Sequence, residues 1–212
     1  MRELIASLFS GKRHLTPLAY APEIDVSATF WSEVAARRPM RVLEAGTLRS
    51  VAGRSTHHKG LFGEIADENY IRIDVADGAD VDVLADLHRL PADWSESFDC
   101  FIAQAVFEHL ERPWIAAQEV ARVLRPGGIF MVGTHQCFPL HGYPRDFFRF
   151  SREALRLIFE DAGLVVSAAD YRHRCAIIPP DDVVHQARLR DWNEAFASFI
   201  LVEATGCKPA SD

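Results

Sequence analysis

The sequence has 212 residues, a net charge of −7, 49% hydrophobic residues and 25% charged residues. This length suffices for one domain with a substantial core, and the composition is typical of a globular chain. The acidic balance argues against nucleic acid as a partner, because nucleic-acid-binding domains normally carry a basic patch. We expect no membrane partner, since no apolar stretch could span a bilayer and no signal peptide is recognisable. The four scattered cysteines form no CxxC pair, which favours reduced thiols in a cytoplasmic protein.

Residues 1–40 are predicted to form a helical cap that precedes the main domain, residues 41–212, within one globular unit. A short amphipathic segment at Glu3–Phe9 comes first, and Val26–Ala36 is the stronger helix, with Ser27 near its start. This helix either packs against a sheet or covers the mouth of a site, and both interpretations stay open.

The next segment predicts two strands with an unusually short connection after the second. Arg41–Gly46 is a buried strand with its turn, and Tyr70–Asp74 is the second strand. The glycines within and after Arg49–Lys59 make a long helix there improbable, so we expect a loop. Only Val75–Asp80 separate the second strand from the next apolar pattern, whereas a parallel crossover needs about a dozen residues. We therefore predict that the second crossover helix is missing and that the third strand is short or absent.

The central part of the chain reads as one βαβ unit. Cys100–Val106 is an apolar run typical of a strand covered on both faces, and Pro113 suits the first turn of a helix. The helix has one apolar stripe, and Pro126–Gly128 is expected to end it and return the chain into the strand Ile129–Gly133. The stripe consists of Ala116, Val120, Val123 and Leu124.

The C-terminal part continues the same alternation after a long polar and aromatic loop over residues 134–150. Ser151 is the expected N-cap of a helix that runs to Gly163. Val165–Ile178 is predicted as mostly strand, Asp181–Asn193 as a helix and Phe199–Val202 as the final strand.

Several ordered motifs carry a resemblance to a known family. Asp99, Phe107-Glu108-His109, the RVLRPGG run at 122–128 and the YPRDFFR run at 143–149 resemble class I S-adenosylmethionine (SAM)-dependent methyltransferases. The resemblance implies an α/β fold: a Rossmann-like, doubly wound, mostly parallel sheet in an α/β/α sandwich. Its last strand would run antiparallel between the fifth and sixth strands.

The resemblance also implies where SAM would bind. The strand end and turn formed by Glu44, Ala45, Gly46 and Thr47 would face its methionine part, with Gln104 beneath, while Asp74 would accept the ribose hydroxyls. Asp86 and Leu87 match the adenine clamp of the family. The chain departs from the family after Gly46, because the later glycines of the turn are replaced by Thr47-Leu-Arg-Ser50. Either this modified turn holds SAM or the cofactor site is damaged.

The polar loop supplies candidates for catalysis and substrate binding. His135 and His141 are candidate general bases, with His109 third, because histidine titrates near neutral pH. Tyr143, Asp146, Arg149 and Arg54 are candidates for substrate binding. The structural alternatives are that His109 caps its turn, that Asp146 and Arg149 form an internal salt bridge, and that Arg54 lies in a solvated loop. We find no convincing metal-ligand set, since the side chains of the adjacent His57 and His58 rarely converge on one ion.

The sequence therefore predicts a SAM-dependent enzyme that methylates a hydroxyl of a small molecule or sugar with a histidine as general base. Two alternatives remain open. One is a methyltransferase-fold protein that has lost catalysis and serves as a binding or scaffold protein. The other is an enzyme that binds SAM for a different reaction.

Overall fold

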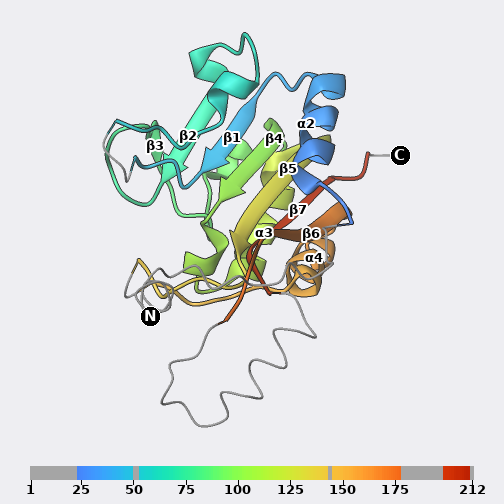
Figure 1. The fold of residues 1–212 in the computed structure, drawn as a ribbon. Coiled ribbons are helices and arrows are strands. Elements are labelled where there is room, and N and C mark those ends of the chain that lie inside the picture. Colours follow the sequence, from blue (N-terminus) through green and yellow to red (C-terminus); the bar gives the residue numbers. More distant parts are fainter. Residues whose placement is uncertain (1–22, 50–52, 143–144, 178–197, 211–212) are drawn as a thin grey trace, which may run out of the picture. The chain divides into compact units, whose positions relative to one another are not determined.

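The computed structural model describes residues 23–49, 53–142, 145–177 and 198–210 (Figure 1). The chain divides into two compact units, of which Pro22–Arg174 with Phe199–Asp212 carries the sheet core and the described helices. The other unit consists of Met1–Ala21 with Cys175–Ser198. The expected segments Glu3–Phe9 and Asp181–Asn193 lie outside the described residues. Within the described part of the chain, no helix is both long and apolar enough to cross a membrane.

The first unit is built on a seven-stranded sheet with the order β3-β2-β1-β4-β5-β7-β6. β1 to β5 pair in parallel, and β7 runs antiparallel to β5, between β5 and β6. This confirms the predicted Rossmann-like sheet with its antiparallel last strand. The strands are β1 (Val42–Ala45), β2 (Tyr70–Asp74), β3 (Val83–Leu84), β4 (Phe98–Gln104), β5 (Leu124–His135), β6 (Val165–Cys175) and β7 (Ser198–Cys207).

The three described α-helices begin where the sequence predicts. Asp25 caps α2 by accepting a hydrogen bond from the Ala28 amide at 2.9 Å, and Ser151 caps α4 through Ala154 at 3.1 Å. Proline opens α3, where its missing N–H costs nothing. The helices are α2 (Val26–Arg37), α3 (Pro113–Val123) and α4 (Arg152–Asp161), and the single 3₁₀ turns are η1 (Lys59–Leu61), η2 (Asp67–Asn69), η3 (Ala92–Trp94) and η4 (Phe107–His109).

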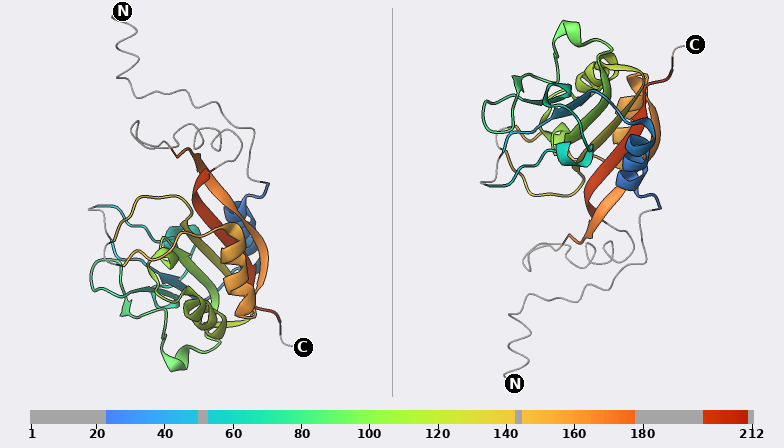
Figure 2. Two further views of the ribbon diagram at one scale, coloured as in Figure 1. Left: turned by 90° about the horizontal axis from the view of Figure 1, so that it is seen from below. Right: turned by 90° about the horizontal axis from the view of Figure 1, so that it is seen from above.

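Alternation along the strands separates the core into two clusters, one on each face of the sheet. On β4, Phe101 and Ala103 belong to the cluster that includes residues of α3 and α4, whereas Cys100 and Ile102 belong to the cluster that includes α2. Figure 2 shows α2 and α4 on opposite sides of the strands. The predicted apolar stripe of α3 is buried throughout.

Two connections decide how the strand ends are arranged. Among the described residues no helix lies between β2 and β3, and β3 has two residues, which confirms the predicted short crossover. The expected turn at Pro126–Gly128 is corrected, because these residues lie within β5, where the pairing with β4 shifts register between Phe98 and Cys100. The shift behaves as a β-bulge, which absorbs the extra residues without ending the strand.

None of the four cysteines forms a disulfide bond in this structure. Cys100 alone of the four is buried, and the others are partly exposed. Burial raises the pKa of the Cys100 thiol well above its usual value, so this residue behaves as a small apolar core group.

Candidate active site

The turn after β1 is fastened to the end of β2. Gly46 has a φ of 75°, and a Cβ there would collide with the side chain of Val106, so glycine is required on two grounds. The Gly46 amide donates to the carbonyl of Ile73 at 2.9 Å, and the Leu48 amide donates to Asp74 Oδ2 at 3.1 Å. The amides of this turn are therefore used to hold the neighbouring strand.

Glu44, a candidate cofactor residue, is 3% exposed and has protein partners on both carboxylate oxygens. Oε2 accepts hydrogen bonds from the amide of His58 at 3.0 Å and from the Tyr70 hydroxyl, and Oε1 lies 2.6 Å from His58 Nδ1. Burial and the adjacent Glu44 carboxylate raise the pKa of the Tyr70 phenol, which therefore stays protonated and donates. In this structure Glu44 ties the loop that follows β1 to the sheet.

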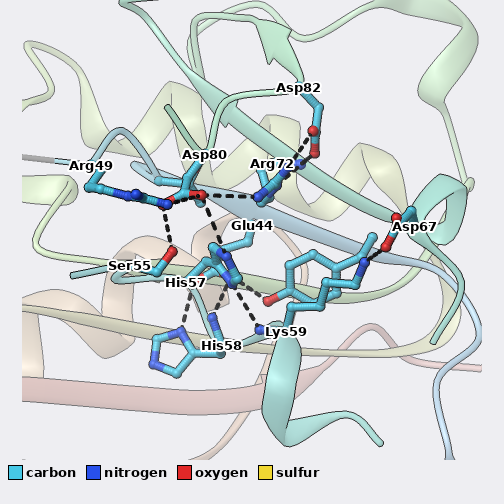
Figure 3. A network of polar contacts seen from close by, with 12 residues as sticks. Glu44, Arg49, Ser55, His57, His58, Lys59, Asp67, Arg72, Asp80 and Asp82 are labelled. Atoms are coloured by element: carbon cyan, nitrogen blue, oxygen red, sulfur yellow. Dashed lines mark hydrogen bonds and ion pairs between the residues drawn. The ribbon is translucent and has the colours of Figure 1, made fainter. Parts of the chain in front are cut away.

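A second carboxylate, that of Asp80, contacts side chains from Arg49, from residues 53–58 and from β2, as Figure 3 shows. Arg49 donates two hydrogen bonds to it, at 2.8 and 3.0 Å, and the Ser55 hydroxyl donates at 2.5 Å. Arg72 reaches the same carboxylate at 3.3 Å, and His57 Nε2 lies 3.8 Å away. These donors hold the pKa of Asp80 well below its usual range, with Arg49 the largest cause. Residues 53–58, the described part of the expected loop before η1, form no helix, and ion pairs with Asp80 hold Arg49 and His57 at its two sides.

The remaining cofactor candidates lie at or near the carboxyl ends of the strands. Asp74 ends β2 and is half-buried, Asp86 follows β3 with its side chain 58% exposed, and Leu87 beside it is 4% exposed. Gln104 ends β4, and its carboxamide lies so close to Gly133 that a Cβ there would collide with it. Ala45 and Thr47 are buried at the end of β1. The parallel sheet thus brings the candidates to one edge, which is where open α/β sheets bind ligands.

The three candidate catalytic histidines gather around one buried carboxylate, that of Glu108 in η4. His135 Nδ1 lies 2.5 Å from Glu108 Oε1, and the Nε2 atoms of His109 and His141 are each 3.9 Å from the same oxygen. The other oxygen, Oε2, accepts a 2.6 Å hydrogen bond from Thr134. Burial works to raise the pKa of Glu108, but the His135 ring and the Thr134 hydroxyl outweigh it and lower the pKa below its ordinary value.

Aromatic and loop contacts fix the orientation of these rings. His135 stacks on Phe138 with ring centroids 4.1 Å apart and an interplanar angle of 17°. His141 meets both His135 and His109 edge-on, at centroid distances of 5.0 and 4.7 Å. The loop approaches closely because Gly142 has a φ of 61°, and a Cβ there would come within 2.9 Å of His109 Cε1.

The candidate substrate residues have different environments. Arg149 and Asp146 form the internal ion pair that was the structural alternative, with contacts of 2.5 and 2.7 Å. Arg149 is the largest cause holding the pKa of Asp146 well below its usual range. Arg54 is exposed on the loop after β1 and is distant in sequence from Glu108 and the three histidines. Tyr143 lies outside the described residues.

Sequence reasoning missed Glu108 as the centre of the site. A glutamate next to a histidine after a buried strand signals a turn at a strand end, but the same glutamate is 0% exposed here. The available signal was Thr134-His135 at the end of the next parallel strand, since neighbouring parallel strands end at the same edge. Glu108, His135 and His141 also form a group that could hold a metal ion, a set that the sequence analysis did not bring together.

A separate cavity of about 770 Å³ lies between α2 and residues 61–66. Its lining includes Met40, Arg38 and Asn69, which precede β1 and β2 and therefore mark the amino ends of these strands. The cavity is thus remote along the strands from the polar groups at their carboxyl ends.

Comparison with known proteins agrees with the fold. Residues 60–132 match the family model described as a methyltransferase domain. No curated protein matches the chain.

Several solved structures resemble the chain over most of its length. A complex between the Haloferax volcanii Trm112 methyltransferase activator and a methyltransferase candidate gives 22% identity and a TM-score of 0.55, over 85% of this chain and 89% of the other. A second structure is the 1,6-didemethyltoxoflavin-N1-methyltransferase of Burkholderia thailandensis, solved with 1,6-didemethyltoxoflavin and S-adenosylhomocysteine. It is 15% identical with a TM-score of 0.56, and the match covers 98% of this chain and 86% of the other. The [4+2]-cyclase SpnF is 18% identical with a TM-score of 0.51, and the match covers 86% of this chain and 82% of the other. At these identities the likeness shows the fold alone.

The sheet order, the antiparallel β7 and the polar strand ends define a class I methyltransferase fold. Together with the matched methyltransferase-domain segment, this confirms the resemblance to class I SAM-dependent methyltransferases predicted from the sequence.

Proposed function

We propose that this protein is a SAM-dependent methyltransferase that acts on a hydroxyl group of a small molecule or sugar. The observation that carries the proposal is the cluster of three imidazoles around the buried Glu108 carboxylate, beside the strand ends at which this fold binds its cofactor. A hydroxyl acceptor must lose its proton, and a positioned base typically contributes about 10²–10⁴-fold to such a reaction.

The candidate cofactor residues have the chemistry that SAM requires. Asp74 offers carboxylate oxygens at the end of β2 for the ribose hydroxyls, and Asp86 with the amide of Leu87 offers an acceptor and a donor for adenine. Ala45, Gly46 and Thr47, with Gln104, would lie along the methionine part. When bound, SAM supplies a methyl group already activated by the sulfonium charge.

The chain's own task is then alignment and proton removal. His135 is the first candidate base, because its ring lies against Glu108 and is held by stacking on Phe138. The carboxylate would stabilise the imidazolium formed when His135 takes the proton from the hydroxyl. His141 and His109 are the other candidates, and alignment of the acceptor with the methyl group would contribute further to the rate. Asp146 and Arg149 hold the loop that carries His141, and Tyr143 and Arg54 complete the proposed substrate contacts.

A second candidate function is favoured by a specific observation. Glu44 and Asp74 both have protein partners in this structure, and the amide of Leu48 occupies one oxygen of Asp74. A fold relative that no longer binds SAM and works as a binding protein would look the same. The [4+2]-cyclase among the structural neighbours also illustrates that this fold carries other reactions.

Calorimetric titration with SAM and with S-adenosylhomocysteine separates these functions. We expect micromolar binding of both. The absence of heat at millimolar cofactor, with the circular dichroism of the folded protein intact, would support the binding protein. Product analysis by mass spectrometry with hydroxylated acceptors then distinguishes methyl transfer from another SAM-dependent reaction.

A further inference from the structure

The carboxylate of Glu108 and the imidazoles of His135 and His141 each offer one ligand atom, and these atoms all lie within 4.8 Å of one another. We propose that the three side chains bind one divalent transition-metal ion between η4, the end of β5 and the loop that follows. Binding of the ion is independent of the proposed methyl transfer, whereas its effect on an acceptor rests on that function.

The strongest support is a pair of buried atoms without hydrogen bonds. Glu108 Oε1 and His135 Nδ1 are both buried, and neither has a hydrogen-bond partner among the described residues. They lie 2.5 Å apart but approach each other off the line of a hydrogen bond. A buried polar atom left unsatisfied costs about 1–3 kcal/mol, so two such atoms in contact point to a missing shared partner. A cation between them would satisfy both.

The second carboxylate oxygen is already engaged, which leaves Oε1 free for the ion. Oε2 accepts the hydrogen bond of the buried Thr134 at 2.6 Å. This contact fixes the carboxylate plane and presents Oε1 to the three histidine rings. Glu108 is therefore arranged as a ligand through one oxygen, with Thr134 as the group that orients it.

His141 is oriented as metal-bound histidines usually are. Its Nδ1 faces the carbonyl oxygen of Pro139 at 3.2 Å and Asp146 Oδ2 at 3.4 Å, so the ring proton belongs on that side. Nε2 then carries the lone pair and points toward Glu108 Oε1, 3.9 Å away. Asp146 is held in turn by Arg149. A histidine whose second nitrogen donates to a carbonyl or carboxylate is the common supporting arrangement in metal sites.

The distances fit an ion after small side-chain movements. Two ligands at about 2.1 Å from a metal, with angles of roughly 90–110°, lie about 3.0–3.4 Å apart. The contact between Glu108 and His135 would open slightly from 2.5 Å, and that between Glu108 and His141 would close slightly from 3.9 Å. His109 stands beside the group, with Nδ1 turned to the carbonyl of Arg145 at 2.7 Å.

The ligand set selects the class of metal. Two imidazole nitrogens with one carboxylate oxygen suit Zn²⁺, Fe²⁺ or Co²⁺, whereas Mg²⁺ and Ca²⁺ prefer oxygen alone. Three protein ligands leave coordination positions open, which is characteristic of catalytic rather than structural sites. A hydroxyl bound at an open position would lose its proton more easily, and His109 would remain as the nearby base.

The test measures metal binding by tag-free, chelator-stripped protein without SAM. Zn²⁺ is titrated calorimetrically and Co²⁺ by its visible absorption bands, with elemental analysis of dialysed samples for stoichiometry. The variants are His135→Ala, His141→Ala and Glu108→Gln, and the control is His173→Ala, which removes an exposed histidine of β6. We expect one ion per chain, at least about a 100-fold loss of affinity in His135→Ala and His141→Ala, and none in the control.

Two results would overturn the proposal: no uptake by folded wild-type protein, or uptake that His141→Ala and His135→Ala leave unchanged. The half-exposed position of His141 in a loop makes its variant the one least prone to misfold, and circular dichroism checks each variant. Because no SAM is present, a protein that fails to methylate any acceptor can still bind the ion. A protein that methylates but takes up no metal retains the proposed function with a histidine base alone.

Discussion

Glu44 and His58 contact each other twice, through the His58 amide at 3.0 Å and through Nδ1 at 2.6 Å from the carboxylate. Glu44 is buried in β1, next to its last residue Ala45, and His58 directly precedes η1, so this contact attaches the segment before η1 to the sheet. Tyr70 donates to the same carboxylate from β2. The acidic residue that the resemblance assigns to the cofactor therefore also has a structural task.

This contact predicts that Glu44 and His58 contribute to stability jointly. Glu44→Gln and His58→Ala should each lower the free energy of unfolding by about 1–3 kcal/mol, because each leaves a buried polar group partly unsatisfied. The double variant should lose less than the sum, since both changes remove the same interaction. Urea unfolding of the four proteins measures the coupling. Additive losses would show that the loop is held elsewhere.

Asp74 provides the test of the cofactor edge. Asp74→Asn keeps the shape of the side chain but removes the charge, so SAM and S-adenosylhomocysteine should bind about 10–100-fold more weakly if the ribose hydroxyls donate to it. The matched control is Asp77→Asn in the adjacent exposed turn. Because Asp74 also accepts from the amides of Leu48 and Ala76, thermal unfolding must accompany the titration. Equal affinities of the variant and the wild type would remove Asp74 from the cofactor site.

The fold was largely predictable because its signals are local or rest on general rules of sheets. A buried apolar run marked β4, Ser151 marked the start of α4, and the short Val75–Asp80 connection excluded a second crossover helix. The bulge in β5 was not predictable, because Pro126–Gly128 has the composition of a turn. Gly127 and Gly128 are held by backbone hydrogen bonds with Lys208, which lies far away along the chain. At this position the tertiary contacts override the turn propensity of the local sequence.

The site was predictable in position but not in connectivity. The histidines could be assigned to the edge above the sheet, since the loop after a parallel strand emerges there. The three histidines surround Glu108, and the Thr134 hydroxyl donates to the second carboxylate oxygen of Glu108. These contacts depend on which side chains converge from two strand ends and a loop. Contacts between residues so distant along the chain leave no local pattern in one sequence. The partners of Glu44 and Asp80 were missed for the same reason.

The Asp80 network predicts a defined loss of stability in acid. Arg49, the largest cause, and Ser55 lower the pKa of Asp80 in the folded protein, so the unfolded chain binds more protons as the pH falls through the ordinary aspartate range near about 3.9. The contribution of Asp80 is thus complete near neutral pH and declines as the pH drops toward its folded pKa. Asp80→Asn should lower stability at pH 7 and progressively less toward pH 3.

Urea unfolding between pH 7 and pH 3 measures this convergence of the two stability curves. Asp77→Asn, on the same exposed turn, is the control and should give a curve parallel to that of the wild type. A constant difference between Asp80→Asn and the wild type at every pH would mean that the network does not stabilise the folded state through the Asp80 charge.

Thr134 tests whether the orientation of Glu108 matters. Thr134→Val keeps the shape of the buried side chain but removes the donor to Oε2, so the metal-free protein should lose about 1–3 kcal/mol of unfolding free energy. The same change should weaken Zn²⁺ binding about 10–100-fold, as is typical when a group that orients a ligand is removed. Thr134→Ser keeps the hydroxyl and is the matched control. Urea unfolding in chelator measures the first effect and calorimetry the second. If Val and Ser behave alike in the metal titration, the Thr134 hydroxyl stabilises the core but does not position Glu108 for an ion.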